Sequence, residues 1–129
     1  MVTRDVDFVV SVDEVELAVA ALEAVGFVVE RHEWSVNFCG RSQVSLQLST
    51  EEFYRDFPAR AVAADVHGIL LRVASLDDTL ADTIKAWRTP ARRPSKATSD
   101  LGDIARLVET HPQLAQTLPA DVTAALDRA

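Results

Sequence analysis

Two aspartates stand two residues apart near the start of the sequence, in a segment with the alternating pattern of a β-strand. In TRDVDFVVSV, the apolar residues Val6, Phe8 and Val10 face one side of the expected strand. Asp5 and Asp7 face the other side, about 6–7 Å apart. Two carboxylates at that distance repel each other unless a cation lies between them. The pair is therefore suited to binding Mg²⁺, which prefers carboxylate oxygens and aligns the phosphates of a nucleoside triphosphate.

The spacing alone leaves a second interpretation open. A sheet with one solvated face also alternates polar and apolar residues, without any metal. D-x-D is a short pattern, so it carries little specificity without its structural context. On this second interpretation, Asp5 and Asp7 are ordinary solvent-facing residues.

Composition limits the classes of protein to which the chain can belong. Its 129 residues and 48% hydrophobic content suit one compact domain with a core. The formal net charge is −7. Residues 1–84 hold 6 Lys/Arg and 15 Asp/Glu, whereas residues 85–129 hold 7 and 5. Proteins that bind duplex DNA without sequence preference are usually basic, so this acidic balance argues against that class.

The single cysteine, Cys39, excludes an intrachain disulfide and fits a reducing compartment. Acidic residues interrupt the first apolar run, so we expect no signal peptide. No apolar stretch reaches the length of about 18 residues that a membrane-spanning helix needs. The sequence therefore predicts a soluble, cytoplasmic protein without membrane contact.

The order of elements predicts an α+β (mixed α/β) fold, with helices packed on a small mixed sheet and C-terminal helices after it. We expect a single domain over residues 1–129, with a sheet-containing core in 1–74 and a helical part in 75–129. Asp13 is expected to cap a helix that ends at Gly26. Residues 27–40 are expected to form one strand, bent near 31–33, that pairs with a strand at 44–49 as a hairpin.

Later segments predict mainly helices. We expect a short helix in 51–65 that breaks around Pro58, and then a strand over 68–73. Ser75 and Asp78 resemble a capping box at the start of the next helix. Residues 88–99, with two prolines, are expected to be a loop before a helix over 100–109. Two short helical pieces separated at Pro119 then close the chain.

The stretch TRDVDFVV, followed by a helix and ALEAVGF, resembles the D-x-D strand and next helix of the nucleotidyltransferase superfamily, which includes DNA polymerase beta. A closer resemblance is to small bacterial nucleotidyltransferase-like proteins related to abortive-infection toxins. It continues through VASLDD, RRPSK and DLGDIARL, so it spans nearly the whole chain. The resemblance is specific in the order and spacing of these segments rather than in one motif.

The resemblance implies a set of site residues and a cofactor. Asp5 and Asp7 would be the catalytic metal ligands and would bind Mg²⁺. The residues expected around the nucleotide and its phosphates are Thr3, Arg92, Arg93, Lys96, Asp100 and Asp103. Two alternatives stay open, since the basic loop also reads as a solvated linker, and the two late acids also suit the start of a helix through its dipole.

Four departures from the family pattern bear on activity. The glycine turn that meets the triphosphate would precede Asp5, where this sequence begins. In place of a third carboxylate, the neighbouring strand offers only Ser45 and Gln47. Thr83 and Ser99 stand where lysines are usual. The resemblance therefore implies a weakly active or inactive nucleotidyltransferase as a lone chain, or a non-catalytic binding or assembly module, such as a toxin–antitoxin or regulatory partner.

The expected small-molecule partner is a nucleoside triphosphate.

In the family, an N-terminal helix precedes the D-x-D strand. Without it, apolar surface is expected to be exposed, and such surface tends to be buried by a partner. We therefore expect a homodimer or a complex with another protein.

Overall fold

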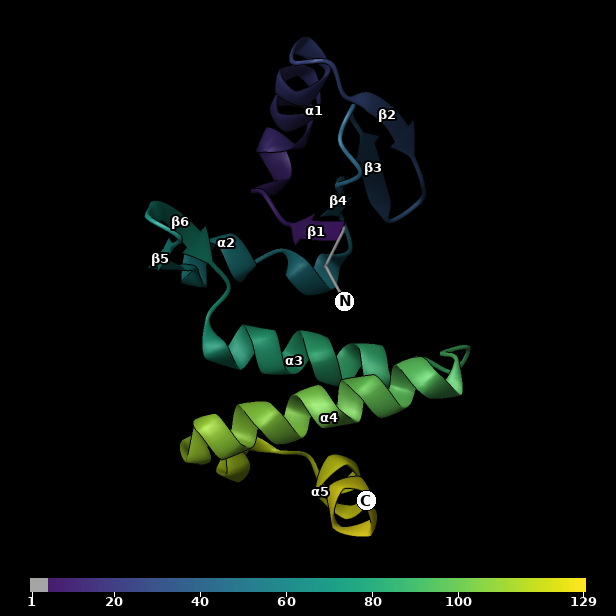
Figure 1. The fold of residues 1–129 in the computed structure, drawn as a ribbon, viewed down its shortest axis with the longest axis vertical. Helices are drawn as coiled ribbons and strands as arrows, with labels where there is room; N and C mark the ends of the chain where they lie inside the picture. Colours follow the sequence, from purple (N-terminus) through teal and green to yellow (C-terminus); the bar gives the residue numbers. More distant parts are fainter. Residues whose placement is uncertain (1–4) are drawn as a thin grey trace. The chain divides into compact units, whose positions relative to one another are not determined.

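The computed structural model describes residues 5–129 and divides the chain into two compact units (Figure 1). The first, which we call the sheet unit, ends at Val73, and the second, the helical unit, runs from Ala74 to Ala129. The expected α+β fold, a small mixed sheet with helices, is confirmed. Among residues 5–129, no helix combines the length and the apolar character needed to cross a bilayer.

The main sheet of the sheet unit has four strands in the order β1-β4-β3-β2. They are β1 (Asp5–Phe8), β2 (Val28–Arg31), β3 (Ser35–Cys39) and β4 (Ser45–Ser49). β1 pairs with β4 in parallel, and the other two pairs are antiparallel. A parallel pair needs a crossover connection, which α1 (Val15–Ala24), β2 and β3 provide here.

Helix α1 covers one face of this sheet and leaves the other face polar. The core under the helix consists of Val19 from α1 and Val36, Phe38 and Leu48 from the central strands. Because side chains alternate along a strand, the neighbours of these core residues in each strand point away from α1. Phe8 packs toward the core, with its ring 6.0 Å from that of Phe38, and this fixes the facing of β1.

The two ends of α1 differ from each other. Asp13 does not cap the helix as expected, because it lies in a 3-10 turn (Val12–Glu14) that precedes α1 without a side-chain cap. Gly26 ends the helix as predicted. Its φ of 102° is a left-handed conformation that favours glycine. The amide of Phe27 then donates to the carbonyl of Leu22 at 3.1 Å.

The prediction of one bent strand over residues 27–40 is wrong, because the chain folds back on itself there. The amide of His32 donates to the carbonyl of Ser35 at 2.8 Å and closes a turn between β2 and β3. This reversal places Val29 opposite Phe38, so that both apolar side chains reach the same core. The predicted hairpin of β3 and β4 is confirmed.

A second, two-stranded sheet completes the sheet unit. It follows a 3-10 turn (Glu52–Tyr54) and α2 (Phe57–Arg60), and consists of β5 (Val62–Val66) and β6 (Ile69–Val73). The helical stretch is interrupted at residues 55–56, close to the predicted break around Pro58. Pro58 itself lies in the first turn of α2, where its missing N–H costs nothing. β5 was not predicted. Its signal is the His67-Gly68 pair, whose φ values of 53° and 83° form a tight hairpin turn.

The helical unit contains α3 (Leu76–Trp87), α4 (Pro94–Thr110), a 3-10 helix (Pro112–Thr117) and α5 (Ala120–Arg128). Ser75 caps α3 as predicted, with its hydroxyl accepting from the amide of Asp78 at 3.1 Å. α4 begins at Pro94, six residues before the predicted start, because proline suits the first position of a helix. The core of this unit consists of Leu80, Ile84, Ile104, Leu114 and Val122.

Candidate functional site: an acidic strand and a polar sheet face

Strand β1 presents both predicted metal ligands to solvent. Asp5 and Asp7 are exposed, and they lie on the face of the sheet opposite α1. Their partners across β4 are Ser45 and Gln47. Because Phe8 is held in the core, a slip of one residue would bury the acids and expose the ring. The packing of the core therefore determines where the carboxylates point.

A row of polar side chains crosses the sheet from Asp7. Register pairs Asp7 with Gln47, Gln47 with Asn37, and Asn37 with Glu30. Paired residues of neighbouring strands share a face, so all four side chains lie on the side away from α1. Two amides therefore separate the carboxylate of Asp7 from that of Glu30. With strands about 4.8 Å apart, the two acids are about 14 Å from each other.

At the β2 end of this row, the polar side chains form hydrogen bonds with one another. His32 Nε2 lies 3.2 Å from Glu30 Oε1 and 3.3 Å from Asn37 Nδ2. Asn37 Oδ1 is buried and has no hydrogen-bond partner among the described residues. A buried acceptor without a partner is costly. The central part of this face therefore has an unused capacity to accept a hydrogen bond.

The two carboxylates of β1 suit an Mg²⁺ ion that is bound together with a nucleotide. No group of three or more acidic, histidine or cysteine side chains close enough to hold a metal occurs among residues 5–129. Mg²⁺ does not need such a cage, because it is commonly bound by one or two carboxylates together with water and substrate phosphates. Asp5 and Asp7 match that pattern. Thr3, the other residue predicted near this strand, lies outside the described residues.

In the helical unit, two of the predicted nucleotide-binding residues bind each other. Arg92 donates from Nε and Nη2 to the two carboxylate oxygens of Asp100, at 2.9 and 3.0 Å. Asp100 is only 7% exposed. This bidentate hydrogen bonding raises the pKa of Arg92 above its usual value. The pair joins the loop after α3 to the first half of α4, which is a structural role.

The other two predicted basic residues lie at the start of α4. Arg93 is the residue before the helix, and Lys96 is in its first turn. Both are exposed, and within the described part of the chain neither forms an ion pair. Cations are disfavoured at a helix N-terminus, so these two residues do not serve the stability of α4 through its dipole.

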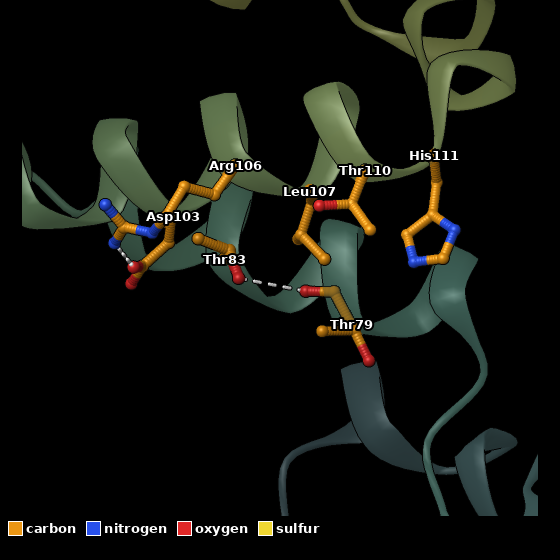
Figure 2. A pocket seen from close by; sticks show the side chains of 7 residues that line it. All are labelled: Thr79, Thr83, Asp103, Arg106, Leu107, Thr110 and His111. Carbon is orange, nitrogen blue, oxygen red and sulfur yellow. Dashed lines mark hydrogen bonds and ion pairs between the residues drawn. The ribbon is translucent and has the colours of Figure 1, made fainter.

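Asp103 lies in a surface hollow of about 400 Å³ between α3 and α4 (Figure 2). The hollow is lined by Thr79, Thr83, Asp103, Arg106, Leu107, Thr110 and His111. Asp103 binds Arg106, one turn further along α4. The hydroxyl of Thr83 donates to the carbonyl of Thr79 at 3.0 Å. The sequence singled out Asp103 and Thr83 separately, and the structure brings them to one hollow while Asp100 pairs with Arg92.

No family model matches this chain, and no curated protein matches its sequence. Among solved structures, a similar one is the crystal structure of the lincosamide antibiotic adenylyltransferase LnuA with lincomycin bound. The match covers 81% of this chain and 72% of that chain, with a TM-score of 0.52 and 12% sequence identity. The fold is nucleotidyltransferase-like. The similarity concerns the fold alone, so the closer resemblance to abortive-infection proteins stays a prediction.

Proposed function

We propose that this chain binds a complex of Mg²⁺ and a nucleoside triphosphate on the exposed face of β1. The observation that carries the proposal is that Asp5 and Asp7 share one solvent-facing side of β1, within a nucleotidyltransferase-like fold. Asp5 and Asp7 would hold the ion, and phosphate oxygens and water would complete its coordination. When bound, Mg²⁺ neutralises charge on the phosphates during in-line transfer of a nucleoside monophosphate.

The residue beside Asp7 bears on how well such a site would work. Gln47 occupies the neighbouring position on β4, and its amide brings no negative charge to the metal. An amide also does not take a proton from an attacking hydroxyl, which a carboxylate can do. Glu30 is three strands away, too far to replace it. We therefore propose that transfer by the lone chain is weak or absent.

Phosphate groups are generally bound by positively charged side chains. Among the predicted basic residues, Arg92 is engaged by Asp100, so Arg93 and Lys96 are the better candidates. Neither is neutralised by a neighbour within the described residues. We propose Arg93 and Lys96 as phosphate-binding side chains of the helical unit, taken by itself. Thr3, outside the described residues, stays a proposed phosphate contact on the strength of the resemblance alone.

Two observations suggest which class of molecule would accept the nucleoside monophosphate: the similar solved structure, and the row of polar side chains across the sheet. The similar solved structure is an adenylyltransferase of an antibiotic, with a small molecule bound. In this chain, Gln47 and Asn37 offer amide groups next to the acid pair, on a face without Lys or Arg in its described strands. Such a surface suits a small molecule with hydroxyl groups, and we propose that class of acceptor.

The binding proposal is tested by thermal stability in the presence of Mg²⁺ and each of ATP, CTP, GTP and UTP. A specific ligand at a hundredfold excess over its dissociation constant adds about 2.7 kcal/mol of stability. We expect this gain with at least one nucleotide, and its loss in Asp5→Ala/Asp7→Ala. The matched control is Asp13→Ala/Glu14→Ala, which removes the same charge from an exposed turn of the same unit. An equal gain in both double variants, or no gain at all, would contradict the proposal.

Pyrophosphate release from the same mixtures separates binding from transfer. We expect little release from the natural chain and more from Gln47→Glu, which adds a carboxylate beside Asp7. Nucleotide binding without release in either protein favours the alternative function, a non-catalytic binding or assembly module such as a regulatory or toxin–antitoxin partner. The observation that favours this alternative is the amide at position 47.

A further inference from the structure

One ring nitrogen of His32 contacts two groups with opposite hydrogen-bonding requirements. Nε2 lies 3.2 Å from Glu30 Oε1 and 3.3 Å from Asn37 Nδ2. An ionised carboxylate only accepts hydrogen bonds, so it requires a proton on Nε2, whereas an amide nitrogen only donates, so it requires a lone pair there. A single nitrogen cannot meet both requirements at once. The protonation of the ring therefore decides which of the two contacts is a hydrogen bond.

The side chain of Asn37 can serve either state of the ring. The two ends of a carboxamide have nearly the same shape, so the group fits its space in both orientations. With a lone pair on Nε2 of His32, the amide directs Nδ2 to the ring, as in this structure. Its Oδ1 is then buried without a partner among the described residues and requires a donor. With a proton on Nε2, the amide turns over, and Oδ1 accepts from the ring.

Gln47 is the neighbouring side chain that can complete either arrangement. It pairs with Asn37 across β3 and β4, and paired residues have Cβ atoms about 4.5–5.5 Å apart, within reach of two amides. When Asn37 turns its oxygen to Gln47, Gln47 donates from Nε2 and its own carbonyl oxygen is left for β1. When Asn37 turns its nitrogen, Gln47 accepts, and its N–H groups are left for β1.

Given the metal site proposed above on β1, we propose that His32 is a positioning residue for that site. The side chain that Gln47 meets on β1 is Asp7. Without a proton on Nε2 of His32, Gln47 presents a carbonyl oxygen beside Asp7, and Mg²⁺ accepts oxygen ligands. With the proton, Gln47 presents N–H groups, which bind no cation and donate to the carboxylate in its place. All of these residues belong to the sheet unit, taken by itself.

The groups around His32 allow this proton to be gained. Glu30 contacts the ring and can accept a hydrogen bond from it. Glu33 follows in the turn and is exposed, and β3 presents a neutral amide to the ring. Arg31 lies on the other face of β2, where it binds Glu16 of α1. Histidine ordinarily changes its charge between about pH 5 and 8, so acidification through this range should add the proton.

NMR spectra of the side-chain amides test this relay in the full chain without metal, between about pH 8 and 5. We expect the ring signals of His32 and the NH₂ signals of Asn37 and Gln47 to move with one common midpoint. His32→Asn should hold both amides still. The matched control is His67→Asn, which removes an exposed histidine from a turn of the same unit and should leave the midpoint unchanged. Amides that do not follow His32, or that still titrate in His32→Asn, would overturn the proposal.

Mg²⁺ titrations followed through the backbone amides of β1 test the consequence for the metal. Loss of a residue that orients a metal ligand typically lowers affinity about 10–100-fold. We expect Mg²⁺ to bind the natural chain about tenfold less tightly at the acidic end of the range than at the basic end. In His32→Asn this difference should disappear, and the comparison separates it from titration of the two carboxylates themselves.

The outcomes distinguish this inference from the proposed function on which it rests. The same pH dependence of Mg²⁺ affinity in the natural chain and in His32→Asn would overturn the role of His32 and leave the metal site intact. Absence of Mg²⁺ binding at every pH would overturn both.

Asn37→Leu provides a second variant, because it interrupts the row without removing the histidine. It should abolish the pH dependence as His32→Asn does, and a dependence that persists would contradict transmission through Asn37.

Discussion

The sheet unit and the helical unit both present predicted acidic site residues, but they use them differently. In the sheet unit, Asp5 and Asp7 are exposed on β1, with serine and glutamine across from them on β4. In the helical unit, Asp100 binds Arg92, and Asp103 binds Arg106. The same side-chain type thus lies across from serine and glutamine in one unit and binds guanidinium groups in the other.

The difference shows that the opposite residue decides what an aspartate can do. Two carboxylates on one solvent-facing side of a strand repel each other, and a cation between them relieves that repulsion. A carboxylate held by two guanidinium hydrogen bonds is already compensated, and removing its partner costs stability. The acids of β1 are therefore the better candidates for chemistry, and Asp100 is the better candidate for a structural role.

The contrast between the two units assumes that each unit unfolds cooperatively by itself. Core substitutions test this assumption, and they have the largest expected effect on the free energy of unfolding. Phe38 and Ile104 are fully buried, each in the core of its own unit. Phe38→Ala should cost about 3–5 kcal/mol of unfolding free energy and Ile104→Ala about 2–5 kcal/mol. We expect each change to destabilise its own unit only.

The two tryptophans report on the units separately, since Trp34 belongs to the sheet unit and Trp87 packs on the helical core. Urea unfolding followed by fluorescence, in Trp34→Phe and Trp87→Phe backgrounds, assigns each transition. If Phe38→Ala moves the signals of both tryptophans equally, the chain unfolds as one domain. That outcome would favour the single domain over residues 1–129 predicted from the sequence.

Comparing two aspartates of α4 tests whether Asp100 has a structural role. Asp100→Asn leaves the partly buried Arg92 without its charged partner. We expect a loss of about 2 kcal/mol, less than for a fully buried pair because the side chain of Arg92 is 33% exposed. Asp103→Asn, which breaks an exposed pair with Arg106, should cost no more than about 0.5 kcal/mol. Urea denaturation measures both, and equal losses would contradict the separation of the two acids.

The smallest expected effect on stability concerns exposed ion pairs, of which each unit has one of the same kind. Hydrogen bonds from Arg88 lower the pKa of Asp121 in the helical unit, and those from Arg31 lower the pKa of Glu16 in the sheet unit. A carboxyl with a lowered folded pKa stabilises the protein above its unfolded pKa, and this contribution is lost as the pH falls through the folded value.

We therefore expect Asp121→Asn to be less stable than the natural chain near neutral pH and equal to it in strong acid. Glu16→Gln should behave alike. Denaturant unfolding between neutral and strongly acidic pH measures both differences, and added salt should reduce them because the pairs are exposed. A difference that persists in strong acid would mean that the variant acts through something other than the charge.

Local patterns were enough to predict much of this fold. The alternation around Asp5 and Asp7, the glycine that ends α1 and the cap at Ser75 are set by neighbours in sequence, and all three are found in the structure. Two of the errors concern the pairing of strands. The turn between β2 and β3 depends on Val29 meeting Phe38 across the sheet, and β5 depends on its partner β6.

The site divides in the same way. The sequence by itself determined that Asp5 and Asp7 share a face, because alternation is a property of any strand. Only the tertiary structure decided that Gln47 stands beside Asp7, that two amides separate it from Glu30, and that Arg92 occupies Asp100. Strand register and the choice of partner for an arginine follow from how the elements pack, which the type of a residue does not specify. The sequence thus specifies which side chains are present, and the tertiary structure determines which of them interact.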